Sequence, residues 1–441
     1  MIIRSGVDEN TVIHLWRELV NAGYDFMTEN RQSVRVKYAG RTSDTSGADL
    51  RDVVLEFDGR TVTGNVEFHV AVGDWRAHGH DRDQAYNDVI LHVVMWQQSG
   101  EITYLENGGV VPTVAVGRFY DDIKQCGLEI IPHQILPCYQ QAEKTPDQIM
   151  SVLNEMGLER FLEKAASFER DLLQFAAGEV LYRGLMEALG YSQNKIPFKK
   201  LAGAVSLSEL QDVVANNNID LLALLYGNAG LLPTQRPEIE SVFQNSYLRT
   251  LENEWSRWRR PPVLHLEEWT FFRVRAGNFP TRRMAGMAAL LKKYSKPELL
   301  HGLERLVKNA LTENSSRILL DGLMCPAEGY WQDHFDFGKE CHGLTPWLIG
   351  ETRAAEIVTN VLLPYYYTYG RGQGDSQLVK KNLALYSVLP QTEENAVEKH
   401  MRMQLGLKRS NLKSTRSQQG ILHLYHKFCV QGKCQSCPLG G

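Results

Sequence analysis

Several features are scarce or missing in this sequence, and each absence excludes a class of protein. No run of eighteen consecutive apolar residues occurs, so a membrane-spanning helix is not expected. The start, MIIRSGVDENTV, lacks the charged and then apolar pattern of a signal peptide. Seven cysteines are too few for the disulfide framework of a secreted chain of 441 residues. We therefore expect a cytoplasmic protein that does not associate with membranes.

Acidic residues are missing from the end of the chain, where no Asp or Glu follows Glu398. Eight Lys and Arg residues follow Glu398 and give this end of the chain a net charge of +8. Because the net charge of the whole chain is −4, the rest of the chain carries −12. A basic surface gains from counterion release when it binds phosphates. We predict that this tail contacts DNA or RNA, and the alternative is a solvated basic face. The candidate contact residues are Lys408, Arg409, Lys413 and Arg416.

What is present divides the chain into three parts. Residues 1–140 combine a helical stripe over residues 8–28 with several strand-like runs, which predicts an α/β module. Residues 141–368 are rich in helix-forming residues at helical spacing, which predicts a mostly α-helical domain. Residues 369–441 are predicted to be a small basic C-terminal segment that carries three cysteines. The hydrophobic content of 43% is enough for large cores.

The richest chemistry lies between residues 47 and 94. Residues 65–70 alternate polar and apolar side chains, which predicts a strand with one buried face. Glu67 and His69 then project together from the other face and could hold a divalent cation. Asp49 opens the preceding strand-like run. We therefore predict a catalytic or metal-binding site that contains Asp49, Glu67, His69, His78 and His80. The alternative is that these histidines cap turns or fill the core.

Arginines alternate with aromatic residues in the central part of the chain. Guanidinium groups bind phosphates in fork geometry, and aromatic faces can stack on unpaired bases. This pattern predicts nucleic-acid contact by Arg257, Arg259, Arg260, Arg273, Arg275 and Arg282. The alternative is that the aromatic residues at this spacing belong to the core.

The terminal cysteines Cys429, Cys434 and Cys437 follow the spacing C-x4-C-x2-C and precede Pro438. Thiolates are preferred ligands of zinc and of iron–sulfur clusters, so we predict a Zn²⁺ or iron–sulfur site here. The site needs a fourth ligand, for which the candidates by residue type are His426, His423, Cys325 and Cys341. The alternative is three reduced thiols in a loop.

Motifs spread over nearly the whole chain resemble those of an uncharacterised bacterial family, catalogued as a domain of unknown function. They are Gly64-Asn65-Val66-Glu67-Phe68-His69, Asp74-Trp75, His78-Gly79-His80, Tyr86-Asn87, Val89-Ile90-Leu91-His92-Val93-Val94, Leu189-Gly190-Tyr191, Asn278-Phe279-Pro280, Asn360-Val361-Leu362-Leu363-Pro364, Gln419-Gly420 and the terminal cysteines. This resemblance implies a family but no activity.

A second resemblance implies a mechanism. A helix, an acidic residue, a strand and a Glu-x-polar pair on the next strand are similar to the core of PD-(D/E)xK nucleases. The resemblance implies a restriction-endonuclease-like mixed sheet in which Asp49 and Glu67 bind Mg²⁺ or Mn²⁺. Glu18 on the helix is a possible outer ligand. His69 stands where that superfamily has lysine, and a histidine could act as a base or bind the metal.

This resemblance predicts metal-assisted hydrolysis of phosphodiesters, with His78 or His80 helping to orient water or protonate the leaving oxygen. Two other classes remain open. A zinc-dependent hydrolase of a small substrate would use Glu67, His69, His78 and His80 as ligands. A non-catalytic nucleic-acid-binding or scaffold protein would keep the basic tail and the cysteine site.

Overall fold

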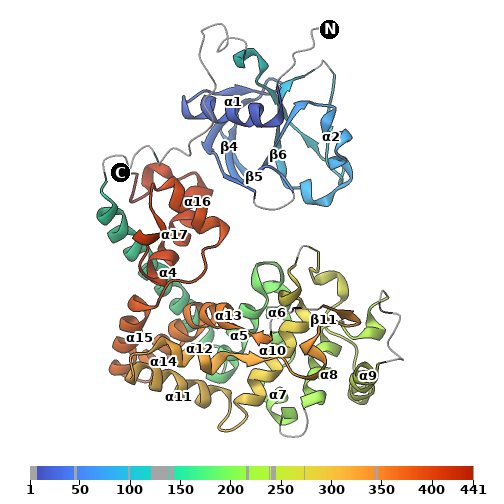
Figure 1. The fold of residues 1–441 in the computed structure, drawn as a ribbon, viewed down its shortest axis with the longest axis vertical. Coiled ribbons are helices and arrows are strands. Elements are labelled where there is room, and N and C mark those ends of the chain that lie inside the picture. The colour runs from blue at the N-terminus through green and yellow to red at the C-terminus, as the bar shows by residue number, and fades with distance from the viewer. Residues whose placement is uncertain are drawn as a thin grey trace. The chain divides into compact units, whose positions relative to one another are not determined.

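The computed structural model describes residues 7–440, except 44–46, 98–99, 121–137, 139–143, 215–217, 238, 240–244, 273, 342 and 344–345. The chain forms two compact units, which Figure 1 shows coloured by residue number. Unit 1 consists of residues 1–157, 394–413 and 417–441, and unit 2 consists of residues 158–393 and 414–416. Residues 369–393 thus belong to unit 2, and most of the later C-terminal residues belong to unit 1.

Unit 1 is built on a mixed sheet of seven strands in the order β1-β2-β4-β5-β6-β9, with β3 paired to β4. Strands β2, β4 and β5 are antiparallel neighbours, whereas β5, β6 and β9 run parallel. The strands are β1 (Phe26–Met27), β2 (Ser33–Tyr38), β3 (Arg41–Thr42), β4 (Leu50–Phe57), β5 (Arg60–Ala71), β6 (Val89–Trp96) and β9 (Thr113–Ala115). A separate hairpin pairs β7 (Thr103–Tyr104) with β8 (Val110–Val111). The expected α/β module is confirmed at this level.

Helix α1 (Glu9–Asn21) covers one face of this sheet. The Asp8 carboxylate caps the helix by accepting the Thr11 N–H at 2.9 Å, as its sequence position predicts. Leu15 and Trp16 are fully buried in one core with Val66 and Phe68 of β5. Because strand side chains alternate, Glu67 and His69 lie on the opposite face.

The connection from β5 to β6 is short and crosses the polar face of the sheet. It contains α2 (Asp74–Ala77) and two 3₁₀ turns at His80–Arg82 and Gln84–Tyr86. Gly64 allows β5 to approach the start of β6, because a Cβ at this position would lie 2.4 Å from Ile90 Cγ2 and 2.8 Å from the Asp88 carbonyl oxygen. The segment that connects β5 to β6 therefore lies against the polar side chains of β5.

Helix α16 (Ala396–Gln404) and most of α17 (Thr415–Lys427) return to unit 1 and pack around Tyr38 and Val54 of the sheet. Two polar contacts join these distant parts of the sequence. The Tyr38 hydroxyl lies 2.9 Å from His400 Nε2, and the Tyr425 hydroxyl donates to Asp52 Oδ2 at 2.6 Å. The end of the chain is therefore part of the sheet-containing unit.

Unit 2 is mostly helical, as expected from its composition. Its helices after the second part of α4 (Pro146–Leu172) are α5 (Ala177–Leu189), α6 (Tyr191–Ala204), α7 (Leu207–Val214), α8 (Asn218–Asn228), α9 (Ser246–Trp258), α10 (Pro280–Lys293), α11 (Leu299–Thr312), α12 (Ser316–Leu323), α13 (Glu351–Ile357), α14 (Leu363–Gly372) and α15 (Ser376–Val388). A π-helical turn, Val358–Leu362, joins α13 to α14. Helix α10 lies at the centre and is buried on nearly every side. Two small antiparallel pairs complete the unit, β10 (Cys325–Pro326) with β13 (Trp347–Ile349) and β11 (His334–Asp336) with β12 (Lys339–Glu340).

Among the described residues, none of the helices combines the length and the apolar character that crossing a membrane requires.

Candidate functional site

A row of polar side chains crosses the centre of the unit 1 sheet. Strand register places Glu67 of β5 opposite His92 of β6, and His92 opposite Thr113 of β9. His69 follows Glu67 on the same face of β5. Glu67, His69, His92 and Thr113 are all buried, so the chain has placed polar groups where apolar ones would ordinarily pack.

Three imidazoles gather at this row. His69 Nε2 lies 3.1 Å from His78 Nδ1, and one ring nitrogen from each of His69, His78 and His80 lies within 4.8 Å of the other two. His69 comes from β5, whereas His78 and His80 come from the crossover that follows α2. The His80 ring stacks on Tyr86 with centroids 3.8 Å apart, and this contact holds His80 above the sheet. The predicted association of these three histidines with Glu67 is therefore present in the structure.

The two predicted carboxylates are neighbours as well. The Asp49 N–H donates to Glu67 Oε2 at 2.9 Å, and the Phe68 N–H donates to Asp49 Oδ2 at 3.1 Å. The other Glu67 oxygen, Oε1, lies 3.4 Å from His80 Nε2. Glu67 thus connects the start of β4 to the histidines.

Helix α1 contributes groups that the sequence did not single out. Glu9 Oε1 lies 3.8 Å from His78 Nδ1 and 4.0 Å from His69 Nε2. Glu18, the outer ligand expected on this helix, is exposed; the acid beside the histidines is Glu9. Arg17 donates to Thr42 Oγ1 at 2.8 Å, and its positive charge acts on the Asp49 carboxyl. Nothing in the local sequence around Glu9 and Arg17, which lie in the first and third turns of α1, indicates that they approach the site.

The electrostatics of the site disfavour its charged forms in the absence of a cation. Burial, followed by the negative charges of Asp49 and Glu9, raises the pKa of Glu67 to about 8. Burial also raises the pKa of Asp49 to about 6, although the Phe68 N–H bond opposes this shift. The Glu67–His80 contact is consequently a neutral pair, because burial also lowers the pKa of His80 to about 4.

A hydrogen-bonded chain supports His69 from behind. His69 Nδ1 lies 2.9 Å from His92 Nε2, and His92 Nδ1 lies 2.8 Å from Thr103 Oγ1. Burial, followed by repulsion from the other imidazoles, lowers the pKa values of His69 and His92 to about 3, so both rings are neutral at pH 7. In the tautomer in which His92 Nδ1–H donates to Thr103, the His69 Nδ1–H donates to His92 Nε2. In that tautomer Nε2 of His69 is unprotonated and faces His78 Nδ1 and Glu9.

These residues fit a divalent cation. Nitrogen ligands of one metal ion lie roughly 3–3.5 Å apart, close to the 3.1 Å between His69 Nε2 and His78 Nδ1. Glu67 adds a carboxylate beside His80, and Asp49 and Glu9 add two more within electrostatic reach of Glu67. A cation would relieve the repulsion among these three carboxyl groups, which the fold itself leaves largely uncompensated.

The terminal cysteines lie in unit 1 on two consecutive 3₁₀ turns, Cys429–Gln431 and Cys434–Ser436. Cys429 is buried, Cys437 is half-buried and Cys434 is exposed. Of the fourth ligands considered from sequence, Cys325 and Cys341 belong to unit 2.

The arginines predicted to contact nucleic acid have different environments. Arg259 and Arg275 are exposed, Arg257 is paired with Glu254, and Arg260 donates to Glu209 Oε1 at 2.9 Å. Arg282 is fully buried and donates to the carbonyl oxygens of Trp331 and His334, so its guanidinium supports the fold instead of facing a ligand. Arg273 lies outside the described residues.

The basic tail is likewise divided. Lys408, Arg409 and Lys413 are exposed in unit 1. Arg416 belongs to unit 2 and donates to Ser387 Oγ at 3.0 Å. The four residues therefore do not form one continuous basic surface within a single unit.

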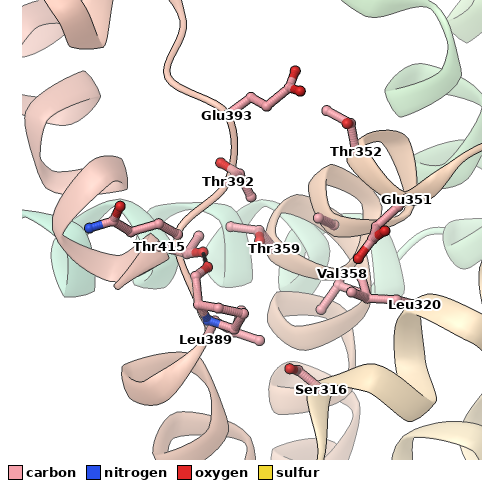
Figure 2. Close-up of a pocket in the computed structure, with 13 residues that line it drawn as sticks. Ser316, Leu320, Glu351, Thr352, Val358, Thr359, Leu389, Thr392, Glu393 and Thr415 are labelled. Carbon is pink, nitrogen blue, oxygen red and sulfur yellow. Dashed lines mark hydrogen bonds between the residues drawn. The ribbon is translucent and has the colours of Figure 1, made fainter. Parts of the chain in front are cut away.

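Unit 2 contains a pocket of about 270 Å³, which Figure 2 shows. Its walls carry the hydroxyls of Thr352, Thr359 and Thr392 and the carboxylates of Glu351 and Glu393. The lining includes neither a histidine nor a cysteine. The titratable cluster of unit 1 is therefore the stronger candidate for a reaction centre.

Comparison with known proteins gives a family for this chain. No curated protein and no solved structure matches it significantly. Residues 9–396 match the family described as "Protein of unknown function (DUF2851)", a range that includes every histidine and carboxylate of the unit 1 cluster. Since this match spans most of the sequence, the chain belongs to the DUF2851 family.

Proposed function

We propose that unit 1 is a divalent-metal-dependent hydrolase that cleaves phosphodiester bonds in DNA or RNA. One observation carries the proposal: the imidazoles of His69, His78 and His80 lie beside the carboxyl groups of Glu67 and Glu9, and Asp49 is bonded to Glu67. Burial and repulsion between the carboxyl groups oppose the charged forms of Asp49 and Glu67. Burying several carboxyl groups together is unfavourable in an ordinary core, whereas a bound cation would stabilise them.

Asp49 and Glu67 would hold the cation through the carboxylate oxygens that are not engaged by backbone N–H groups. His69 would complete the set through Nε2, because its Nδ1 side is held by His92. A divalent cation supplies positive charge that acidifies an attacking water and stabilises charge on the phosphate in the transition state. His78, which is exposed, would protonate the leaving oxygen.

The phosphodiester substrate is favoured by the order of elements. Helix α1, the acid at the start of β4 and the Glu-x-His pair on the antiparallel strand β5 follow the order that the PD-(D/E)xK resemblance implies. The Arg17 guanidinium acts on the same site from α1 and could contact a phosphate oxygen. The histidine in place of lysine favours a softer cation such as Mn²⁺ over Mg²⁺.

The test uses full-length protein stripped of metal and then supplied with Mg²⁺, Mn²⁺ or Zn²⁺ in the presence of labelled DNA and RNA. Wild-type protein should cleave at least one substrate, and Glu67→Gln and Asp49→Asn should each lower the rate by roughly 10³-fold. Glu18→Gln is the matched control, since Glu18 is exposed on α1 and should leave the rate unchanged. If no cation supports cleavage by the wild type, or if Glu67→Gln cleaves normally, the proposal fails.

A second candidate is a zinc-dependent hydrolase of a small substrate. The proximity of the His69, His78 and His80 nitrogens favours it, because three imidazoles are a typical zinc ligand set. His69→Lys separates the two functions. A lysine should retain some Mn²⁺-dependent cleavage of nucleic acid in the nuclease-like site, but it should abolish stoichiometric zinc binding in the zinc site.

A further inference from the structure

We propose that Cys138, Cys429, Cys434 and Cys437 together bind an iron–sulfur cluster, with Cys138 as the fourth ligand. This site is separate from the histidine and carboxylate cluster and does not depend on the proposed hydrolase activity. The spacing of the terminal cysteines supplies three ligands from one loop, and the fold supplies the fourth from a distant part of the sequence.

Helix α16 brings the two parts together. The Cys138 N–H donates to the Gln404 carbonyl oxygen at 2.8 Å, and Gln404 Nε2 donates to Cys138 Sγ at 3.2 Å. Cys429 Sγ lies 3.9 Å from Met401 Sδ. Met401 and Gln404 are three residues apart on α16, so they share one face of the helix. Cys138 and Cys429 therefore contact the same helix face, about one turn apart.

The terminal loop is folded so that its other cysteines stay near Cys429. The Lys433 N–H donates to the Phe428 carbonyl oxygen at 2.9 Å, and the Cys437 N–H donates to the Cys434 carbonyl oxygen at 3.2 Å. Gly432 lies between these turns with a φ of 62° and packs against the sheet. A Cβ at this position would lie 3.1 Å from Lys37 Cβ and from Val54 Cγ1. The loop therefore needs glycine here in order to pack closely against β2 and β4.

The thiols affect one another electrostatically. Burial, followed by the charges of Cys138, Cys434 and Cys437, raises the pKa of the Cys429 thiol well above its ordinary value. Burial likewise raises the pKa of Cys138 to about 11, with smaller contributions from Cys434 and Cys437.

The sulfurs of the described cysteines are spaced too widely for a single zinc ion. Thiolates around one tetrahedral zinc lie about 3.8 Å apart, given Zn–S bonds of roughly 2.3 Å. Among the described residues, the groups of three ligand atoms that lie within 4.8 Å of one another include no cysteine. A core of several iron and sulfide ions holds its cysteines farther apart than one ion does, and four cysteines are its usual ligand set.

The experiment is to purify the full chain anaerobically and to measure iron, acid-labile sulfide and zinc together with the visible and EPR spectra. We expect about four irons and four sulfides per chain and a brown chromophore. Cys138→Ser should lower the iron content at least about fivefold, and so should Cys434→Ser, which alters an exposed side chain that the fold tolerates. Cys341→Ser, a change in unit 2, is the control and should keep the full iron content.

Three results would overturn the proposal: stoichiometric zinc in place of iron, no metal in the wild type, or a cluster that survives Cys138→Ser. Circular dichroism of each variant tests whether iron loss reflects unfolding. If Cys138→Ser unfolds the protein, Cys434→Ser and reconstitution with ferrous iron and sulfide decide the outcome. Failure of reconstitution in folded Cys434→Ser supports the site, and full reconstitution refutes it.

Discussion

Buried charged groups occur in both units, but their surroundings differ in kind. In unit 2, the Arg236 guanidinium forms bonds of 2.8 and 2.9 Å to the two oxygens of Asp336, and both side chains are almost completely buried. In unit 1, Glu67 is buried beside Asp49, and its environment raises its pKa to about 8. The fold neutralises the first group and leaves the second to be neutralised by a proton or by a cation.

The same contrast extends to the arginines of α10. Arg282 donates to two backbone carbonyl oxygens, and Arg283 donates to the Leu348 carbonyl oxygen at 2.7 Å. These guanidinium groups hold β11, β13 and the 3₁₀ helix Gly329–Gln332 against the central helix. A buried charge with complementary partners therefore indicates a structural role, whereas buried carboxyl groups of like charge are candidates for binding a cation. Four predictions test this distinction, in order of decreasing effect.

The largest effect is expected where the fold provides the partner. Arg236→Met leaves Asp336 buried without its main counter-charge, so the free energy of unfolding should fall by about 3–5 kcal/mol. Chemical denaturation measures this change. Arg257→Met is the matched control, because the Arg257 side chain is 72% exposed in its pair with Glu254. Equal effects of the two changes would show that the buried pair is not structural.

The second prediction has the opposite sign. In metal-free protein, Glu67→Gln should stabilise unit 1 by roughly 2–4 kcal/mol at pH 9, as order-of-magnitude linkage implies. The folded-state pKa of Glu67, about 8, lies above the ordinary 4.5, so wild-type stability falls as the pH rises through this window. The gain should therefore be absent at pH 4 and complete above pH 8.

Thermal unfolding from pH 4 to 9 measures the Glu67→Gln effect. Glu56→Gln serves as the control on the same sheet, since Glu56 pairs with Lys37 at 2.9 Å and its loss should stabilise nothing. A destabilised Glu67→Gln protein at pH 9 would contradict the view that this carboxyl awaits a cation.

The third prediction concerns His92, which positions His69 without reaching the cation itself. His92→Asn should weaken metal affinity about 10- to 100-fold, since outer hydrogen-bond partners contribute that much at metal sites. Isothermal titration with Mn²⁺ and Zn²⁺ measures the affinity. His400→Asn also alters a neutral imidazole in unit 1, one that is half-buried and bonded to Tyr38, and it should leave the affinity unchanged. Thr103→Val should weaken affinity less than His92→Asn.

The smallest effect concerns exposed charge. Changing Lys408, Arg409 and Lys413 together to Ala should reduce the slope of log affinity for DNA or RNA against log salt by about 2–3. Arg416→Ala should alter the slope less, because its guanidinium is engaged with Ser387 in unit 2. Fluorescence anisotropy at several salt concentrations provides the slopes. An unchanged slope in the triple variant would identify the tail as a solvated face.

Local patterns anticipated much of unit 1. The alternation over residues 65–70 placed Glu67 and His69 on one face of a strand, opposite Val66 and Phe68, whose side chains lie in the α1 core. The prediction of a single buried face was wrong, because Glu67 and His69 are buried as well. The run at residues 89–94, which is apolar except for His92, forms the interior strand β6. Helix α1 begins after Asp8 as its cap predicts, but it ends at Asn21 and not near residue 28. Helix ends are less readable because they depend on the packing of the chain that follows.

Arginine environments were harder to read. Arg259 and Arg282 occur in similar arginine and aromatic contexts, yet one is exposed and the other is fully buried. The difference arises because α10 is enclosed by other helices and small strand pairs, and no local pattern reveals that enclosure. Composition indicates which side chains can bind phosphate, but only packing decides which ones reach solvent.

The sequence by itself indicated that Glu67 and His69 share one face of a strand, because backbone geometry imposes periods that local residues must follow. It also supplied the candidate metal-binding residues, which remain a prediction. Only the tertiary structure decided that Glu9 joins the histidines, that His92 is bonded to His69 and that Cys138 and Cys429 contact the same helix, α16. These associations join residues that are distant along the chain. They depend on which surfaces pack together. The packing is decided by interactions throughout the whole unit, so no short segment of the sequence reveals it.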